Sequence, residues 1–190
     1  MSLALSIAFG ALAWTLLEYV IHRWLGHDRR FVRGLFGVQH TAHHSRGDYF
    51  GPAWMKVCAA AGVAALFIGP SAWILGWQNG AGFVAGLIGC YAGYELIHRL
   101  NHVVAPRSTY GRWARRHHFY HHFHNPKVNH GVTTPLWDVV FGTYVRPTAI
   151  HVPTKLAMRW LVDPETGEIH PAHRADFRLR GKQTPARSVV

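Results

Sequence analysis

The chain of 190 residues contains 16 histidines, and their spacing points to a metal site. The densest stretch, residues 117–124, holds five histidines in eight positions. If this stretch is helical, His118, His121 and His122 converge within about 100° of arc, because residues three and four apart share a helix face. Neutral imidazole is a common ligand and suits iron, zinc or copper. A solvated low-complexity run is the alternative interpretation, but the same spacing recurs elsewhere in the chain.

Ten histidines form four clusters with ligand-like spacing. They are the pair His22 and His27, the triplet His40, His43 and His44, the pair His98 and His102, and the triplet His118, His121 and His122. Since one metal takes about four to six ligands, ten imidazoles imply two metals. We expect each of the two identical triplets to be joined by one pair from the end of a membrane helix.

The two pairs differ in what they require of the backbone. His98 and His102 lie four residues apart, about 40° apart around a helix, so they can bind one metal from a regular helix. His22 and His27 lie five residues apart, about 140° around the axis. The helix must therefore end or distort between them, and Gly26 offers that freedom.

The distribution of charge predicts membrane segments. All 20 Lys and Arg fall within residues 23–56 and 99–187, and the only charged residues in the two remaining stretches, 1–22 and 57–98, are Glu18 and Glu95. Apolar runs at 2–21, 53–77 and 81–97 are each near the roughly 20 residues that a helix needs to cross a bilayer.

Three crossings place all four histidine clusters on one side of the membrane. The first run ends at His22, and the other two form a hairpin that returns to His98. Gly69-Pro70 should kink or break the second run, and Gln78-Asn79-Gly80 reads as the turn of the hairpin. A crossing ending at Pro70 would leave residues 71–79, too few to span. The basic side is the cytoplasmic one by the positive-inside rule.

The net charge of +11 does not indicate a nucleic-acid partner. The basic residues flank the apolar runs, so anionic lipid headgroups and topology account for them. We expect an all-α integral membrane protein with about three transmembrane helices and a histidine-rich helical cap. Residues 1–150 would form the membrane-embedded domain, and residues 151–190 a polar extension that is disordered beyond Arg180.

The ordered series of motifs resembles the fatty acid hydroxylase superfamily. Its elements are Glu18-Tyr-Val-Ile-His22-Arg-Trp-Leu-Gly-His27, His40-Thr-Ala-His43-His44, Tyr94-Glu-Leu-Ile-His98-Arg-Leu-Asn-His102, His118-Phe-Tyr-His121-His122, and the closing segment Asn129-His130-Gly-Val-Thr-Thr-Pro-Leu-Trp-Asp138. The resemblance runs from about residue 15 to 146. That superfamily includes fatty acid and sphingolipid hydroxylases and sterol desaturases, with carotenoid hydroxylases as relatives.

The resemblance implies a membrane di-iron enzyme that uses O2 and two electrons to oxidise an unactivated C–H bond of a fatty acyl chain, sphingolipid or sterol. The ten clustered histidines would hold the two irons, and zinc could replace iron in purified protein. No fused heme or flavin domain is evident, so the resemblance implies a separate electron donor, a ferredoxin or a b-type cytochrome.

Three carboxylates are candidates for a role beside the metals. Glu18 and Glu95 each precede a histidine pair in an otherwise uncharged run, and carboxylates within a membrane are costly and usually functional. We expect both to accept hydrogen bonds from metal-bound imidazoles, with simple pairing to a nearby Arg as the alternative. Asp138 would orient another imidazole or cap a turn.

Three further histidines stay unassigned. His117, His121 and His124, at i, i+4 and i+7, would form an alternative set of ligands on one helix face. His118 is preferred to His117 because it matches the spacing of the other triplet. His124 and His130 would line the site or lie on the surface.

Two other functions are alternatives to lipid hydroxylation. A lipid or sterol desaturase, or a carotenoid ring hydroxylase, would use the same metal site with a different pocket. A membrane metal-binding or transport protein would need histidines along a path through the bilayer, and the predicted spans have none in their interiors.

Overall fold

The computed structural model describes residues 1–181 and is mostly helical. The longer helices are α1 (Leu3–Val20), α2 (Leu35–Arg46), α3 (Ala53–Leu75), α4 (Trp77–Val103) and α5 (Thr109–Phe123). Shorter elements are the π-helical turn η1 (Ile21–Gly26), α6 (Leu136–Val140), β1 (Ile150–Pro153), the 3-10 turns η2 (Thr154–Leu156) and η3 (Pro171–His173), and β2 (Phe177–Arg180). The predicted disorder beyond Arg180 falls on residues 182–190, which lie outside the described part.

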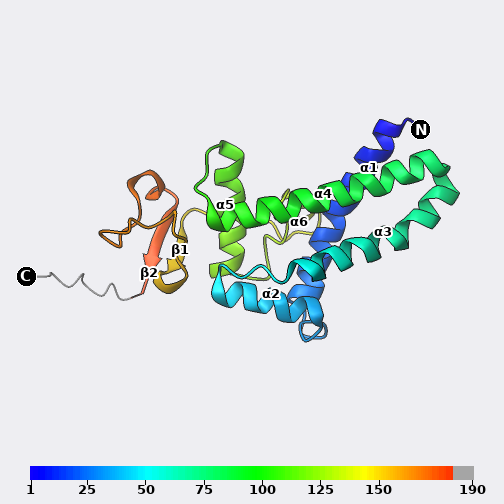
Figure 1. Cartoon of the computed structure of the whole chain (residues 1–190). Helices are drawn as coiled ribbons and strands as arrows, with labels where there is room; N and C mark the ends of the chain where they lie inside the picture. The colour runs from blue at the N-terminus through cyan, green and yellow to red at the C-terminus, as the bar shows by residue number, and fades with distance from the viewer. Residues whose placement is uncertain (182–190) are drawn as a thin grey trace, which may run out of the picture.

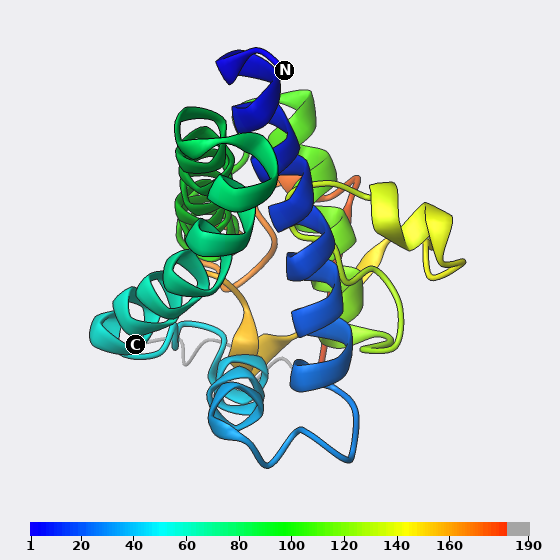
Figure 2. The same ribbon diagram turned by 90° about the vertical axis from the view of Figure 1, so that its right-hand side faces the viewer.

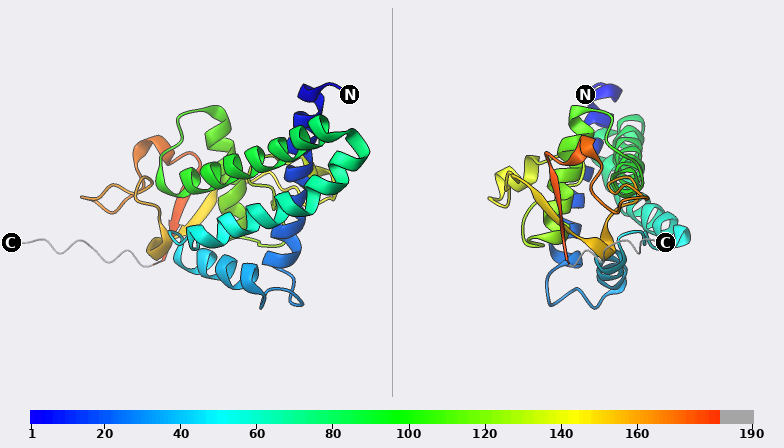
Figure 3. Two further views of the ribbon diagram at one scale, coloured as in Figure 1. Left: turned by 45° about the vertical axis from the view of Figure 1, so that its right-hand side comes forward. Right: turned by 90° about the vertical axis from the view of Figure 1, so that its left-hand side faces the viewer.

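Three helices are long and apolar enough to cross a membrane, as predicted. They are Leu3–Gly26, Ala53–Leu75 and Trp77–Val103. The helices α3 and α4 run side by side as a hairpin, and α2 and α5 lie at the end opposite to its turn (Figures 1 and 3). Helix α1 packs along α4 and runs down toward α2 (Figure 2). The ends of α1 and α4 that carry histidines therefore reach the same side as α2 and α5.

The hairpin is tighter than the sequence indicated. Helix α3 continues through Pro70 to Leu75, so the proline does not break it. The turn is the single residue Gly76, with φ of 78°. The prediction that Gln78-Asn79-Gly80 forms the turn is wrong, because these residues belong to the first turn of α4. A positive φ suits glycine, and one such residue suffices to reverse the chain.

The helix distortion predicted between His22 and His27 is present. Helix α1 continues directly into η1, where the backbone adopts π-helical geometry and ends at Gly26. Because a π-helix makes i→i+5 hydrogen bonds, it brings residues five apart toward one another. The His22 and His27 ring centroids lie 5.3 Å apart.

Glycines allow α1 and α4 to approach closely. A Cβ on Gly86 would lie 2.0 Å from the carbonyl oxygen of Ile7, and one on Gly10 would lie 1.8 Å from that of Phe83. Small residues at such positions let helix backbones touch. Of four glycines in the middle of α4, Gly82 and Gly86 meet α1, whereas Gly89 and Gly93 have open space.

The segment after α5 packs back on that helix. Strands β1 and β2 pair in parallel, with Ile150 opposite Phe177. A small core forms between this pair and α5 around Phe119, Val152 and Leu161, all fully buried. The segment thus covers the face of α5 that turns away from the transmembrane helices (Figure 1).

The close contact between α1 and α4 predicts that Gly86→Ala destabilises the protein by about 1–3 kcal/mol, because the new methyl overlaps a backbone oxygen. Gly89→Ala is the matched control: it has open space, and alanine favours a helix over glycine by up to about 1 kcal/mol. Thermal unfolding in detergent measures both. Equal midpoints for the two variants would show that α1 and α4 do not depend on this contact.

Candidate metal centre

The structure gathers all ten predicted histidines into two groups of five. One nitrogen from each residue lies within 4.8 Å of the others in its group. The first cluster comprises His22, His27, His40, His44 and His121, and the second comprises His43, His98, His102, His118 and His122. The turn η1 with the residue that follows it, α2 and α5 supply the first cluster, and α2, α4 and α5 supply the second.

The grouping differs from the expected one, because each triplet is divided between the clusters. From α2, His40 and His44 face the first cluster and His43 the second. From α5, His118 and His122 face the second cluster and His121 the first. Residues four apart are separated by about 40° on a helix, whereas the residue three along points about 60° to the other side. Each triplet therefore straddles both clusters.

Backbone carbonyls set the orientation of three imidazoles. The Nδ1–H of His43 donates to the carbonyl of Tyr49 at 2.7 Å, that of His121 to the carbonyl of Val128 at 2.8 Å, and that of His22 to the carbonyl of His130. Because a carbonyl can only accept, the proton sits on Nδ1 and the lone pair on Nε2. This is the arrangement in which metal-ligating histidines are usually held.

The Nε2 atoms approach one another too often for ordinary hydrogen bonding. In the first cluster, the Nε2 atom of His27 lies 2.8 Å from Nε2 of His121 and 2.9 Å from Nε2 of His40. The Nε2 atoms of His40 and His44 lie 3.0 Å apart. A neutral imidazole has one proton, so at most two of these three contacts can be hydrogen bonds. Ligand nitrogens about 2.1 Å from one metal and at right angles lie about 3.0 Å apart, which fits the spacing.

The second cluster has the same character. The Nε2 atoms of His43 and His98 lie 2.9 Å apart, and those of His102 and His118 lie 3.0 Å apart. Among residues 1–181, both ring nitrogens of His122, and Nε2 of His22 in the first cluster, are buried without a hydrogen-bond partner. Buried polar atoms are normally paired, so such atoms indicate a missing ion or ligand.

Burial keeps the imidazoles in the form that binds metal. Outside the membrane-spanning helices, burial lowers the pKa of His27 and His43 to about 4 and that of His44 to about 2. Burial, followed by neighbouring imidazoles, lowers the pKa of His118 and His121 well below the usual value. Neutral imidazoles at neutral pH are competent ligands without first losing a proton.

The two intramembrane carboxylates do not take the expected role toward the imidazoles. Glu18 accepts hydrogen bonds from the backbone N–H of Val132 and Thr133 and from the Thr133 hydroxyl, the last at 2.7 Å. Glu95 forms an ion pair with Lys56. Glu18 thus holds the loop after Asn129, and Glu95 joins α4 to α3 through a lysine rather than an arginine.

Asp138 orients an imidazole, but that of His117 and not one of the ten clustered residues. Its carboxylate accepts from Nε2 of His117 at 3.2 Å, from the Thr143 hydroxyl at 2.7 Å, and from the N–H groups of His130 and Gly131, both at 2.8 Å. It therefore fixes the loop from its other side. These interactions, with burial opposing them, lower the pKa of Asp138.

The remaining histidines lie outside the two clusters. His117 is buried between Trp113 and Tyr144, so the structure favours His118 for the cluster. His124 accepts from the backbone N–H of His151 at 2.8 Å. His130 is buried beside the first cluster, with its ring centroid 5.3 Å from that of His121.

The carbonyls that accept from the imidazoles were not predicted, because a backbone acceptor carries no side-chain signal in the sequence. The loop that carries Val128 and His130 bends at Asn129, which has φ of 57°, a conformation that asparagine tolerates. The Asn129 amide bonds the backbone of Val145 at 2.7 and 2.9 Å. Asparagine at position 129, with Gly131 two residues later, is a turn signal in the sequence.

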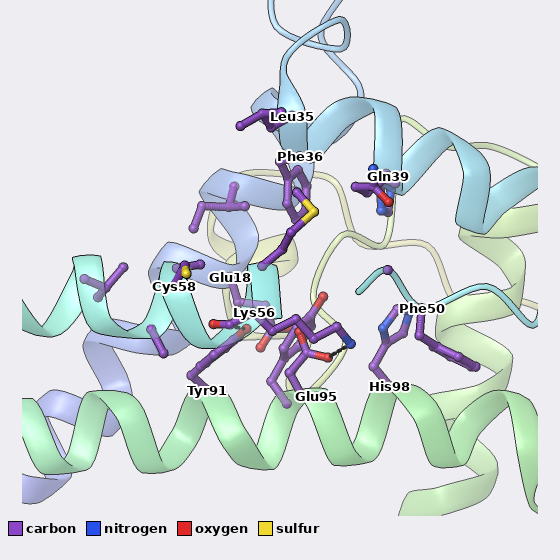
Figure 4. A pocket seen from close by; sticks show the side chains of 18 of the residues that line it. Glu18, Leu35, Phe36, Gln39, Phe50, Lys56, Cys58, Tyr91, Glu95 and His98 are labelled. Atoms are coloured by element: carbon purple, nitrogen blue, oxygen red, sulfur yellow. Dashed lines mark hydrogen bonds and ion pairs between the residues drawn. The ribbon is translucent and has the colours of Figure 1, made fainter. Parts of the chain in front are cut away.

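A cavity of about 510 Å³ borders both clusters. Its polar lining includes His22 and His40 of the first cluster and His43 and His98 of the second, and the remainder is largely apolar side chains of α1, α2, α3 and α4 (Figure 4). The fold and site therefore define a membrane protein in which an apolar cavity leads to two clusters of imidazoles.

The comparison with known sequences identifies the family. The family model described as fatty acid hydroxylase matches residues 7–143, and the chain belongs to this family. The fatty acid 2-hydroxylase of Rattus norvegicus is 32% identical over 144 residues, covering 72% of this chain and 38% of that protein. The ceramide very long chain fatty acid hydroxylase of Saccharomyces cerevisiae is 31% identical over 153 residues, covering 74% and 38%.

A solved structure shares the fold. The structure of full-length scs7p, in which only the hydroxylase domain is visible, superposes with a TM-score of 0.63 at 27% identity and covers 79% of this chain and 60% of that one. The dihydroceramide fatty acyl 2-hydroxylase of Arabidopsis thaliana is 27% identical and covers 74% of this chain. The chain spans between 38% and 61% of the length of these three curated relatives.

The contacts of Glu18 predict that Glu18→Leu loosens the loop at residues 132–133. Two backbone N–H groups and a hydroxyl would lose their acceptor, and each such hydrogen bond contributes about 0.5–1.5 kcal/mol. We expect faster amide hydrogen exchange at Val132 and Thr133 and a lower unfolding midpoint. Glu165→Leu, at an exposed turn, is the control and should change neither.

Proposed function

We propose that the chain is a membrane di-iron oxygenase that hydroxylates an unactivated C–H bond of an acyl lipid, with O2 and two electrons from a separate ferredoxin or b-type cytochrome. The observation that carries the proposal is the pair of five-imidazole clusters at the end of an apolar cavity between membrane helices. Membership of the fatty acid hydroxylase family supports it, as do the printed names of the relatives.

The donor set fits iron better than structural zinc. Structural zinc takes four ligands, whereas each cluster offers five nitrogens. Five imidazoles per cluster would suit iron, which takes up to six ligands and would supply the chemistry with O2. In this proposal the ten clustered histidines hold two irons, and zinc in purified protein would reflect its tight binding to such sites.

When bound, iron would supply the reduction of O2 needed to insert one oxygen atom into a C–H bond while the other leaves as water. The residues of the chain would bind and orient the metals and the acyl chain. The carbonyls of Tyr49, Val128 and His130 hold three imidazoles in one tautomer. The apolar cavity wall aligns an acyl chain beside His22 and His98 and excludes water, which protects an oxidising site from side reactions.

The location follows from topology. The clusters lie where α1 and α4 end and α3 begins, and basic residues lie close to each of these points in the sequence. We propose that this side faces the cytoplasm, in keeping with the positive-inside rule.

The division of histidines predicts metal stoichiometry. His43→Ala and His121→Ala remove ligands from different clusters, so each should reduce iron from about two to about one per chain, and the double variant should bind almost none. Metal analysis after expression in iron-rich medium measures this. His151→Ala, an exposed residue outside the clusters, is the control. Full metal content in both single variants would refute the two-cluster assignment.

The reaction predicts a defined change in membrane lipids. A deletion strain complemented with the wild-type chain should accumulate acyl lipids with one added oxygen, and His43→Ala or His121→Ala should reduce that product at least about 100-fold. Lipid mass spectrometry separates the alternatives. Loss of two hydrogens would identify a desaturase, and metal uptake without lipid change would favour a metal-binding or transport protein.

A further inference from the structure

The short helix α6 has its polar residue inside and its apolar residues outside. Its only charged residue is Asp138, and that side chain is fully buried. The side chains of Val139 and Val140 are 60% and 58% exposed, and Leu136 and the neighbouring Phe141 are exposed as well. A helix at a protein surface in water turns its polar residues outward and its apolar residues inward. The reverse polarity of α6 indicates apolar surroundings.

The contacts of α6 place it beside a part of α1 that lies within the membrane span. The indole N–H of Trp137 donates to the Thr15 hydroxyl at 2.9 Å, and the Phe141 ring stacks on Tyr19 with centroids 5.1 Å apart. Thr15 precedes His22 by seven residues in this span, or about 10 Å along a helix axis. Since His22 belongs to the first cluster, α6 lies on the membrane side of that cluster.

The surroundings of α6 suit a lipid surface. Figure 2 shows α6, in yellow, projecting from the side of α1 that faces away from the hairpin of α3 and α4. Its exposed face therefore continues the outer surface of a membrane span. The chain next passes through Tyr144 and Arg146, both exposed. Aromatic residues concentrate at the membrane interface, and basic residues bind anionic headgroups. This order matches a segment that leaves the acyl region through the headgroups.

We propose that α6 inserts into the bilayer leaflet nearest the histidine clusters, with Leu136, Val139 and Val140 against acyl chains, and that this lipid contact holds the loop that orients His22. The occupant of the exposed face is the bilayer and not a second copy of the chain. The inference goes beyond the proposed hydroxylase and does not depend on its reaction.

A continuous series of hydrogen bonds joins α6 to the first cluster. The Asp138 carboxylate accepts from the backbone N–H groups of His130 and Gly131, both at 2.8 Å, and the carbonyl of His130 accepts from the Nδ1–H of His22. Asp138 can hold the loop only while α6 stays beside α1. Acyl chains that cover the apolar face of α6 stabilise it in that position. The membrane therefore supports one side of the first cluster through α6.

Fluorescence quenching tests the insertion. In a chain with Cys58→Ala and Cys90→Ala, Val139→Cys carries a fluorophore in phospholipid nanodiscs that hold one chain each. Lipids with a nitroxide near the top of the acyl chain quench a fluorophore in the leaflet, and iodide quenches one in water. We expect lipid quenching at least about fivefold stronger than at Glu165→Cys, because an interfacial helix lies about 5–10 Å into the headgroup boundary. Leu66→Cys, exposed within α3, is the positive control.

Hydrogen exchange in the same nanodiscs tests the support of the loop. Val140→Asp places a charge in the leaflet, which is costly and displaces α6. Amide exchange at His130 and Gly131 should accelerate at least about tenfold, because both N–H groups lose their acceptor. Val140→Thr keeps the branched shape without a charge and is the matched control, expected to change exchange less than about twofold.

Three results would overturn the proposal. Quenching of position 139 by iodide and not by lipid would place α6 in water. Lipid quenching that disappears when each disc holds two chains would identify a second copy as the occupant. Equal exchange in Val140→Asp and Val140→Thr would show that α6 holds the loop without lipid. The quenching experiment changes only exposed or cysteine positions to neutral residues, so it still decides the proposal if Val140→Asp does not fold.

Discussion

The arrangement of the site depends on how the loop at residues 128–133 is held. Its carbonyls fix the imidazoles of His22 and His121, which come from helices far apart in sequence. The loop contains no helix or strand that would fix its shape. Two buried carboxylates secure it from opposite sides, Glu18 through residues 132 and 133 and Asp138 through residues 130 and 131. The two acids therefore act on these imidazoles indirectly: each carboxylate holds the backbone of the loop, and the carbonyls of the loop hold the imidazoles.

Helix geometry explains how two helices can each contribute to both histidine clusters. A triplet with spacing i, i+3 and i+4 sends two side chains to one side and the third to the other. Helices α2 and α5 both carry this triplet, and they use it in opposite senses: α2 gives two imidazoles to the first cluster, and α5 gives two to the second. Each pair from a membrane helix then completes its cluster to five. For α1, this requires the π-helical turn η1, since a regular helix would point His27 away from His22.

Much of this architecture could be predicted from local sequence. The three membrane helices follow from the distribution of charge, and the ten clustered histidines follow from spacing, because both depend on periodicities within a single segment. Both Gly76 and Gln78-Asn79-Gly80 are candidate turns in the sequence, and local sequence does not decide between them. The structure places the turn at Gly76, because the first turn of α4 accommodates residues 78–80. The roles of Glu18 and Asp138 could not be predicted either. Their partners are 115 and eight residues away along the chain, and a carboxylate near a histidine in sequence need not face it in space.

The same reasoning applies to Glu95, whose place in a repeated motif drew attention to His98 and away from Lys56. An acid one turn before a histidine shares its helix face, so both point toward the cavity, and the partner is whatever the opposing helix supplies there. In this fold α3 supplies a lysine. The buried acids therefore have different partners and different roles. Glu18 and Asp138 accept hydrogen bonds from the backbone of the loop at residues 130–133, whereas Glu95 pairs with Lys56 beside the cavity. A carboxylate that accepts hydrogen bonds from the backbone of this loop is suited to hold the imidazoles in place, and an ion pair between two helices is suited to join α3 to α4.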